Sequence, residues 1–78
     1  MAVVRKFVKG ERAIKSLQPT QVECLYIRGE IDGNRILQID TYGSQHREKP
    51  GKQSQTLQFT EESARDLWQI LRKEFGFK

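Results

Sequence analysis

A tight-turn signal between two alternating segments constrains the fold of this chain more than any other feature. Asp32, Gly33 and Asn34 follow residues 21–31 and precede residues 35–42, and both segments alternate as β-strands do. Asp-Gly and Gly-Asn pairs supply the positive φ angles that tight hairpin turns require. In the first segment apolar residues fall on both faces, which is typical of a central or doubly covered strand. The sequence therefore predicts an antiparallel hairpin with these two segments as its strands.

Residues 60–75 carry the signals of one amphipathic helix. Thr60 is an expected N-cap, and Glu61 and Glu62 follow it in the first turn, where negative charge complements the helix dipole. Apolar residues recur at helical spacing and form one stripe: Ala64, Leu67, Trp68, Leu71 and Phe75. Gly76 is a natural stop. We expect the stripe to pack on the sheet and to belong to the core.

Two shorter apolar segments extend the hairpin to a four-stranded sheet. Residues 3–8 are typical of an edge strand or of an arm that pairs with a sheet, and residues 56–59 form a last short strand. Four strands and then one helix indicate an α+β fold. We expect a four-stranded antiparallel sheet followed by one C-terminal amphipathic helix packed on one face. Residues 20–78 form this single domain, and residues 1–19 form a basic N-terminal arm and connection.

The length of the chain limits how stable one protomer can be. A chain of 78 residues forms one domain with a small core, which disulfides, a metal or oligomerisation commonly reinforce. Cys24 is the only cysteine and His46 the only histidine, so neither an internal disulfide nor a structural zinc site is expected. We therefore expect a homodimer without metal or cofactor. Trp68, Ile70 and Phe75 exceed the apolar surface that one sheet face must cover, and we expect them at the dimer interface.

Several classes of protein do not fit this sequence. It contains no apolar run approaching 18 residues and no signal-peptide pattern, so we expect neither a membrane protein nor an exported one. A single unpaired thiol fits a reducing compartment, so we expect a cytoplasmic location. No nucleophile–base pair, metal-ligand spacing or glycine-rich phosphate loop is present, so we expect no enzyme and no small-molecule substrate.

The excess positive charge is concentrated at the start of the chain. Residues 1–19 hold five cations and one anion, whereas the other residues are balanced, so the net charge of +4 belongs to this segment. A sparse basic arm is typical of sequence-independent contacts with polyanions, nucleic acid above all. We expect Arg5, Lys6 and Lys9 to make such contacts. The alternative is a solubilising tail.

A second basic segment lies between the third and fourth expected strands. Arg47, Lys49 and Lys52 surround a Pro-Gly turn, and Ser54 follows among small polar residues. A basic turn flanked by hydroxyl and amide side chains suits the phosphate backbone of a nucleic acid. The alternative is a set of solvated loop charges.

Three further residues complete the candidate nucleic-acid site. Arg28 and Arg35 lie near the hairpin turn, on its expected exposed edge. Tyr42 ends the second hairpin strand, where its ring has two interpretations. It stacks on a base, as exposed aromatic residues do in proteins that bind single strands, or it caps the core at the strand end.

The order of these features resembles a known family. The strand from Ile36 to Tyr42 leads into Lys49-Pro50-Gly51-Lys52, then into a short strand and an amphipathic helix. This arrangement is similar to the single-stranded-DNA-binding domain of the transcriptional coactivator positive cofactor four and its bacterial and phage relatives. The resemblance covers residues 22–75. It implies a β-β-β-β-α fold that dimerises through helices and strands and binds unpaired DNA along curved sheets. Asp40 stands where that family has a strand arginine.

The sequence thus leads to two functional interpretations. The first is a non-enzymatic nucleic-acid-binding module for single-stranded DNA, which uses the basic turn and a sheet face and acts as a homodimer. The alternative is a protein-interaction or accessory module that dimerises through its C-terminal helix and binds no nucleic acid. Salt dependence discriminates them, because contacts with phosphates weaken steeply as salt rises.

Overall fold

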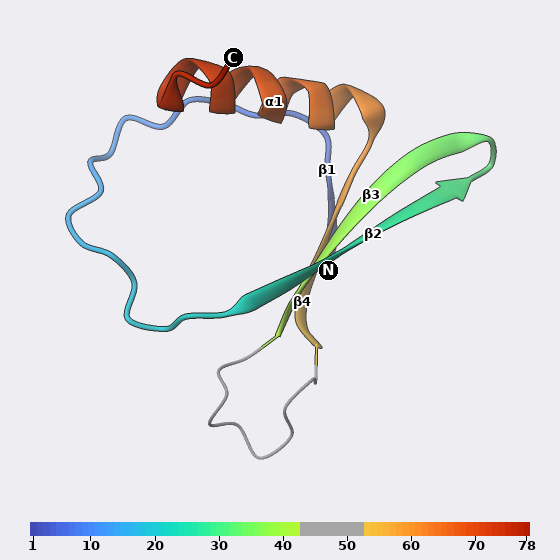
Figure 1. Ribbon diagram of the computed structural model, residues 1–78, viewed down its shortest axis with the longest axis horizontal. Coiled ribbons are helices and arrows are strands. Elements are labelled where there is room, and N and C mark those ends of the chain that lie inside the picture. The colour runs from blue at the N-terminus through green and yellow to red at the C-terminus, as the bar shows by residue number, and fades with distance from the viewer. Residues whose placement is uncertain (43–52) are drawn as a thin grey trace.

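The chain forms a four-stranded sheet followed by one helix, as a computed structural model shows (Figure 1). The structure describes the backbone of residues 1–42 and 53–78 and the side chains of residues 1–42 and 55–78. The elements in chain order are β1 (Ala2–Val4), β2 (Glu23–Ile31), β3 (Asn34–Tyr42), β4 (Gln53–Phe59) and α1 (Glu61–Phe75). The predicted α+β class is confirmed.

The predicted hairpin joins β2 and β3. Ile31 lies opposite Asn34, and the two residues between them both have positive φ, 51° at Asp32 and 80° at Gly33. Positive φ at both central positions is what a two-residue type I′ turn requires, and its twist matches that of the strands. The pairing then continues without a register shift along all nine residues of β2. The local turn signal was therefore sufficient to predict this part of the sheet.

The strand order is β1-β4-β3-β2, and the sheet is mixed. β4 pairs antiparallel with β3, with a register shift near Thr41 and Tyr42. β1, however, runs parallel to β4, with Ala2 opposite Leu57 and Val4 opposite Phe59. The prediction of a purely antiparallel sheet is therefore wrong for β1, and the expected strand over residues 3–8 is shorter and begins one residue earlier.

The long connection after β1 explains why the first strand departs from the prediction. Residues 5–22 form neither helix nor strand, and they arc from the β1 edge of the sheet to the start of β2 at the other edge (Figure 1). A segment of this length returns the chain to the end of the sheet where β2 starts, as parallel strand directions require. A short turn after β1 would instead have made β2 an antiparallel neighbour of β1. Nothing local in a three-residue strand specifies which edge it joins.

Helix α1 begins and ends as its sequence predicts. The backbone N–H of Ser63 donates to Thr60 Oγ1 at 3.2 Å, and the backbone N–H of Thr60 donates to Ser63 Oγ at 2.9 Å. This reciprocal capping box satisfies N–H groups that have no partner within the helix. At the other end Gly76 adopts the left-handed conformation with φ 71°. Glu61 and Glu62 lie in the first turn, and Arg72 and Lys73 in the last.

The apolar core is small and lies at the junction of β4 and α1. Phe59 is 5% exposed and stacks on Phe7 of the N-terminal arm, with ring centroids 6.4 Å apart. Of the helix stripe, Ala64, Leu67 and Leu71 are half-buried. Trp68 and Phe75 are 52% and 69% exposed, so the prediction that the whole stripe is core is wrong for both. The reason is geometric, because α1 extends from the end of β4 away from the β2–β3 hairpin (Figure 1).

The capping box generates a first prediction. Thr60→Ala removes the side-chain acceptor for the Ser63 N–H, and we expect it to lower the free energy of unfolding by about 1 kcal/mol. Thr60→Ser keeps the acceptor and is the matched control. Urea denaturation at a fixed protein concentration measures both. An equal loss in the two variants would show that the methyl group of Thr60, and not its hydroxyl, stabilises the start of α1.

Candidate nucleic-acid interface

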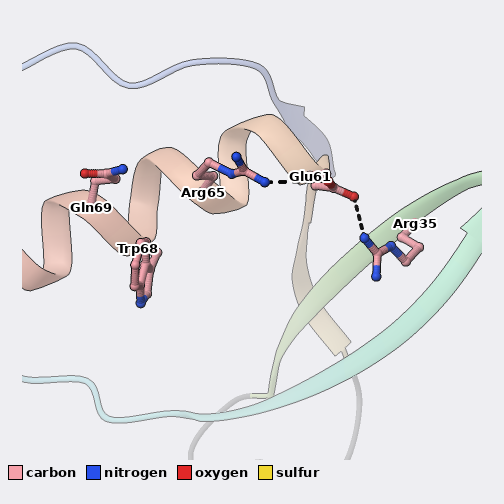
Figure 2. A pocket seen from close by; sticks show the side chains of 5 residues that line it. All are labelled: Arg35, Glu61, Arg65, Trp68 and Gln69. Carbon is pink, nitrogen blue, oxygen red and sulfur yellow. Dashed lines mark hydrogen bonds and ion pairs between the residues drawn. The ribbon is translucent and has the colours of Figure 1, made fainter. Parts of the chain in front are cut away.

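An open concavity lies between the first half of α1 and the β3 strand. We call it the α1 concavity, and its lining comprises Arg35, Glu61, Arg65, Trp68 and Gln69 (Figure 2). Arg35 comes from β3 and the other residues from α1. In Figure 2 the Arg35 and Arg65 side chains both point toward Glu61, and the Trp68 ring projects from α1 into open space. The concavity therefore brings two guanidinium groups and an aromatic face to one surface.

The charges in the α1 concavity are paired through one carboxylate. Glu61 Oε1 accepts a hydrogen bond from Arg35 Nη2 at 2.8 Å, and Glu61 Oε2 lies 3.8 Å from Arg65 Nη2. More than half of each of these three side chains is exposed, so the pairs contribute little to stability. A guanidinium has five N–H donors, and a single carboxylate cannot use those of two arginines. The arrangement orients both groups and leaves donors for an anionic ligand.

Two exposed aromatic residues belong to the same side of the sheet. Trp68 has the guanidinium carbon of Arg72 4.8 Å from its ring centroid, a cation–π contact. Tyr26 of β2 is 78% exposed and lies opposite Ile39 of β3. Because side chains alternate along a strand, Ile39 and Arg35 share one face, and Tyr26 shares it with them. The sheet thus presents an aromatic ring on the face that α1 partly covers.

Sequence reasoning missed Tyr26, Arg65 and Arg72. Tyr26 was assigned to a central or doubly covered strand, whereas β2 is an edge strand with all nine residues exposed. The alternation of the strand could have identified Tyr26 as a site residue. It puts Tyr26 on the same face as Arg28, which was expected to be exposed. The two arginines follow at helical spacing from Glu61 and Trp68.

The predicted strand residues fall on two faces. Arg28 is exposed on β2 and shares a face with Tyr26 and Arg35. Tyr42 is half-buried at the end of β3, and alternation puts it on the opposite face. The structure therefore brings Arg28 and Arg35 to one side of the sheet and does not bring Tyr42 to them.

The basic arm is exposed, and the pairing of β1 with β4 and one aromatic contact anchor it. Arg5, Lys6 and Lys9 are all exposed, and the stacking of Phe7 on Phe59 holds this part of the arm beside the end of β4. Within residues 1–42 and 55–78, the ion pairs are those of Glu61 with two arginines, and no cation of the arm takes part in one. The charges of the arm are therefore available to a polyanion.

The predicted basic turn is only partly covered by the structure. Arg47, Lys49 and Lys52 lie outside the described residues. Ser54 contributes its backbone to β4, and its side chain also lies outside the described part. The phosphate-binding role of these four residues stays a prediction.

The residues expected at a dimer interface are all exposed in the protomer. Trp68 and Phe75 share one side of α1, whereas Ile70, 37% exposed, falls on the opposite side. Phe75 stacks on Phe77 with ring centroids 5.4 Å apart, so an aromatic pair ends the helix. Apolar side chains on both sides of a helix form a surface that a partner can cover.

The position that the resembling family fills with arginine has a different environment here. Asp40 is 3% exposed, and its Oδ1 accepts hydrogen bonds from Thr56 Oγ1 at 2.7 Å and from Gln38 Nε2 at 3.0 Å. Gln58 Nε2 in turn donates to Gln38 Oε1 at 3.0 Å. This chain of hydrogen bonds links β3 to β4 on the face opposite Tyr26. A buried carboxylate that is fully engaged with strand neighbours is no contact for phosphate.

Comparison with known proteins does not identify a family for this chain, and the described residues contain neither a metal-binding group nor a membrane-spanning helix. No family model, curated protein or solved structure matches this chain. Among the described residues, no three His, Cys, Asp or Glu side chains gather in a group that could hold a metal ion. In the same part of the chain, no helix has the length and apolar character needed to cross a membrane.

The network around Asp40 generates a second prediction. Asp40→Ala leaves Thr56 and Gln38 without their buried acceptor, and we expect a loss of about 1–3 kcal/mol in the free energy of unfolding. Asp40→Asn keeps an oxygen that accepts from Thr56, and we expect a smaller loss. Equilibrium unfolding in urea, at matched protein concentration, measures the difference. If Asp40→Asn is as unstable as Asp40→Ala, the negative charge and not the hydrogen-bond acceptor is what the network requires.

Proposed function

We propose that this protein is a non-enzymatic module that binds single-stranded nucleic acid, with single-stranded DNA as the expected ligand. One observation carries the proposal: exposed aromatic rings and arginines share one open surface. Trp68 and Arg35 line the α1 concavity, and Tyr26 lies on the same side of the sheet. Proteins that bind single strands combine aromatic faces for the bases with cationic groups for the backbone.

The chemistry of this surface favours an unpaired strand over a duplex. The bases of a duplex stack on each other, so a protein ring can stack only on bases that are splayed out. Half-exposed Trp68 and largely exposed Tyr26 offer such rings from two different elements. Arg35 and Arg65 supply planar guanidinium groups, which bind phosphate through paired hydrogen bonds. The ligand would therefore run through the α1 concavity with its bases toward the rings.

The basic arm adds a second contact that does not depend on sequence. Arg5, Lys6 and Lys9 are exposed beside the end of β4. They would contact phosphates of the same strand, and Lys49 and Lys52 of the predicted basic turn are proposed to add further contacts. Each phosphate contact releases condensed counterions, so binding to a single strand weakens with salt in proportion to the number of contacts.

A second candidate function is association through α1, and the exposed area of the protomer favours it. The protomer exposes 7615 Å², whereas a compact protein of 9.1 kDa exposes about 4,900 Å². The connection of residues 5–22, which is exposed throughout, contributes to this difference, and so do the exposed apolar side chains of α1 and β2. A partner that covers these side chains would reduce the exposed area. We propose a homodimer under both candidate functions, with Trp68, Ile70 and Phe75 among its contacts.

A titration of a short labelled oligothymidylate, followed by fluorescence anisotropy, tests the nucleic-acid proposal. We expect the affinity of Trp68→Ala to fall about fivefold or more, because stacking on a base contributes about 1–3 kcal/mol. Ile70→Ala is the matched control, since it removes an exposed apolar side chain from the opposite side of the same helix. Equal losses in the two variants would show that α1 acts through dimer stability and not through base stacking.

The same titration separates the two candidate functions. Between about 50 and about 200 mM salt we expect the affinity to fall more than about tenfold, as several phosphate contacts require. A duplex of the same sequence should bind more weakly than the single strand. Absence of binding at tens of micromolar, or binding without salt dependence, would leave the interaction module as the function. The double variant Lys49→Ala/Lys52→Ala measures how much the basic turn contributes to the affinity for the oligothymidylate.

A further inference from the structure

The outer edge of β2 is a long and regular template for strand pairing. β2 is the last strand of the sheet, so β3 is its only neighbour within the described fold. All nine of its residues are exposed, and its pairing with β3 has no register shift. In an antiparallel pair, alternate residues of an edge strand turn their N–H and C=O groups away from the neighbour. The edge therefore presents a row of backbone donors and acceptors to solvent.

Proteins usually protect such an edge, and β2 has only part of the usual protection. Short strands, bulges, proline and charged side chains, lysine above all, are the common devices against edge-to-edge pairing. Of these, β2 has charged side chains at Glu23, Arg28 and Glu30. The opposite edge of this sheet has one of them, because β1 is only three residues long. β2 contains neither proline nor lysine and no bulge. Its apolar side chains are exposed on both faces, with Leu25 and Ile27 on one and Tyr26 on the other.

We propose that the β2 edge pairs antiparallel with the β2 edge of a second copy of this chain. The two sheets then join into one sheet of eight strands, whose outer edges are the two short β1 strands. This contact is distinct from association through α1, and it would cover exposed apolar side chains of β2. The occupant is a second copy because β2, paired antiparallel with itself about Ile27, puts no like charges opposite each other and puts Tyr26 opposite Arg28.

The length of the overlap and the charges of β2 together select one alignment of the two strands. An axis through Arg28 would put the two Arg28 side chains opposite each other, and like charges directly opposite destabilise a strand pair. An axis through Ile27 overlaps all nine residues. It puts Ile27 opposite its own copy and Tyr26 opposite Arg28 of the second copy, an arrangement that allows a cation–π contact. We therefore assign the axis to Ile27.

The joined sheet would also extend the candidate nucleic-acid interface. A two-fold axis perpendicular to the sheet keeps equivalent faces on one side. Tyr26 and Arg28 of both copies then lie together at the centre of one continuous face. The pairing itself does not rest on the proposed function, since backbone edges and exposed apolar side chains carry it. Nucleic-acid binding and strand pairing can therefore fail separately.

Cysteine cross-linking in full-length protein tests the pairing directly. In a Cys24→Ser background, we expect Ile27→Cys to form an intermolecular disulfide on mild oxidation, because directly opposite strand residues have Cα atoms within the range that a disulfide spans. Arg28→Cys, one residue away, is the matched control and should cross-link at least about tenfold more slowly. A maximum at Leu25→Cys or Gly29→Cys would keep the edge pairing and overturn the axis at Ile27. No maximum on β2 would overturn the proposal.

Sizing by light scattering gives an independent readout. We expect Ile27→Lys, which puts two charges opposite each other at the axis, to form a smaller assembly than the wild type. Ile70→Lys is the control for the helix, with a similar starting exposure of 37% against 43% for Ile27. Circular dichroism verifies that each variant is folded. A wild-type monomer, or an assembly that only Ile70→Lys makes smaller, would overturn the proposal even if the oligothymidylate binds.

Discussion

Phe59 is the residue at which the separate parts of this small fold meet. It ends β4, lies opposite Val4 of β1 and Leu37 of β3, and stacks on Phe7 of the arm. The next residue, Thr60, begins the cap of α1. Burial of one large aromatic side chain therefore holds together two strand pairings, the arm and the direction in which the helix leaves the sheet. The α1 concavity exists because α1 departs from this junction at an angle to β3.

Away from that junction the protomer covers little of its apolar surface. Tyr26, Trp68 and Phe75 are all more than half exposed, and they come from an edge strand and from the middle and the end of α1. Small domains commonly complete their cores with a second chain. The same exposed aromatic groups suit a nucleic-acid strand, so one surface has two potential occupants. The proposed pairing of β2 edges resolves the competition in part, because it uses backbone groups and leaves the ring of Trp68 for a ligand.

The sequence predicted what short-range chemistry determines and missed what depends on distant partners. Asp32 and Gly33 specify their turn, and Thr60 specifies the start of its helix, because neighbouring residues satisfy the geometry in each case. The parallel pairing of β1 was not predictable, since a three-residue strand contains no information about its neighbour. The exposure of Tyr26 depends on β2 being an edge, which is a property of the whole sheet. Of the candidate site, Arg28 and Arg35 were correctly expected to be exposed, whereas the companions of Arg35 on α1 were not recognised.

The pairing of β1 with β4 also has a consequence for the order of folding. Ala2 lies opposite Leu57, so the strand nearest the N-terminus has to wait for a neighbour near the other end of the chain. The β2–β3 hairpin and α1 contain their own local signals and can form while synthesis proceeds. β1 cannot dock until β4 has left the ribosome, and closing so long a loop carries an entropic cost that only three residue pairs offset. Of the four strands, we therefore expect the first in the chain to join the sheet last, with the arm behind it open to a ligand or a second chain until that step.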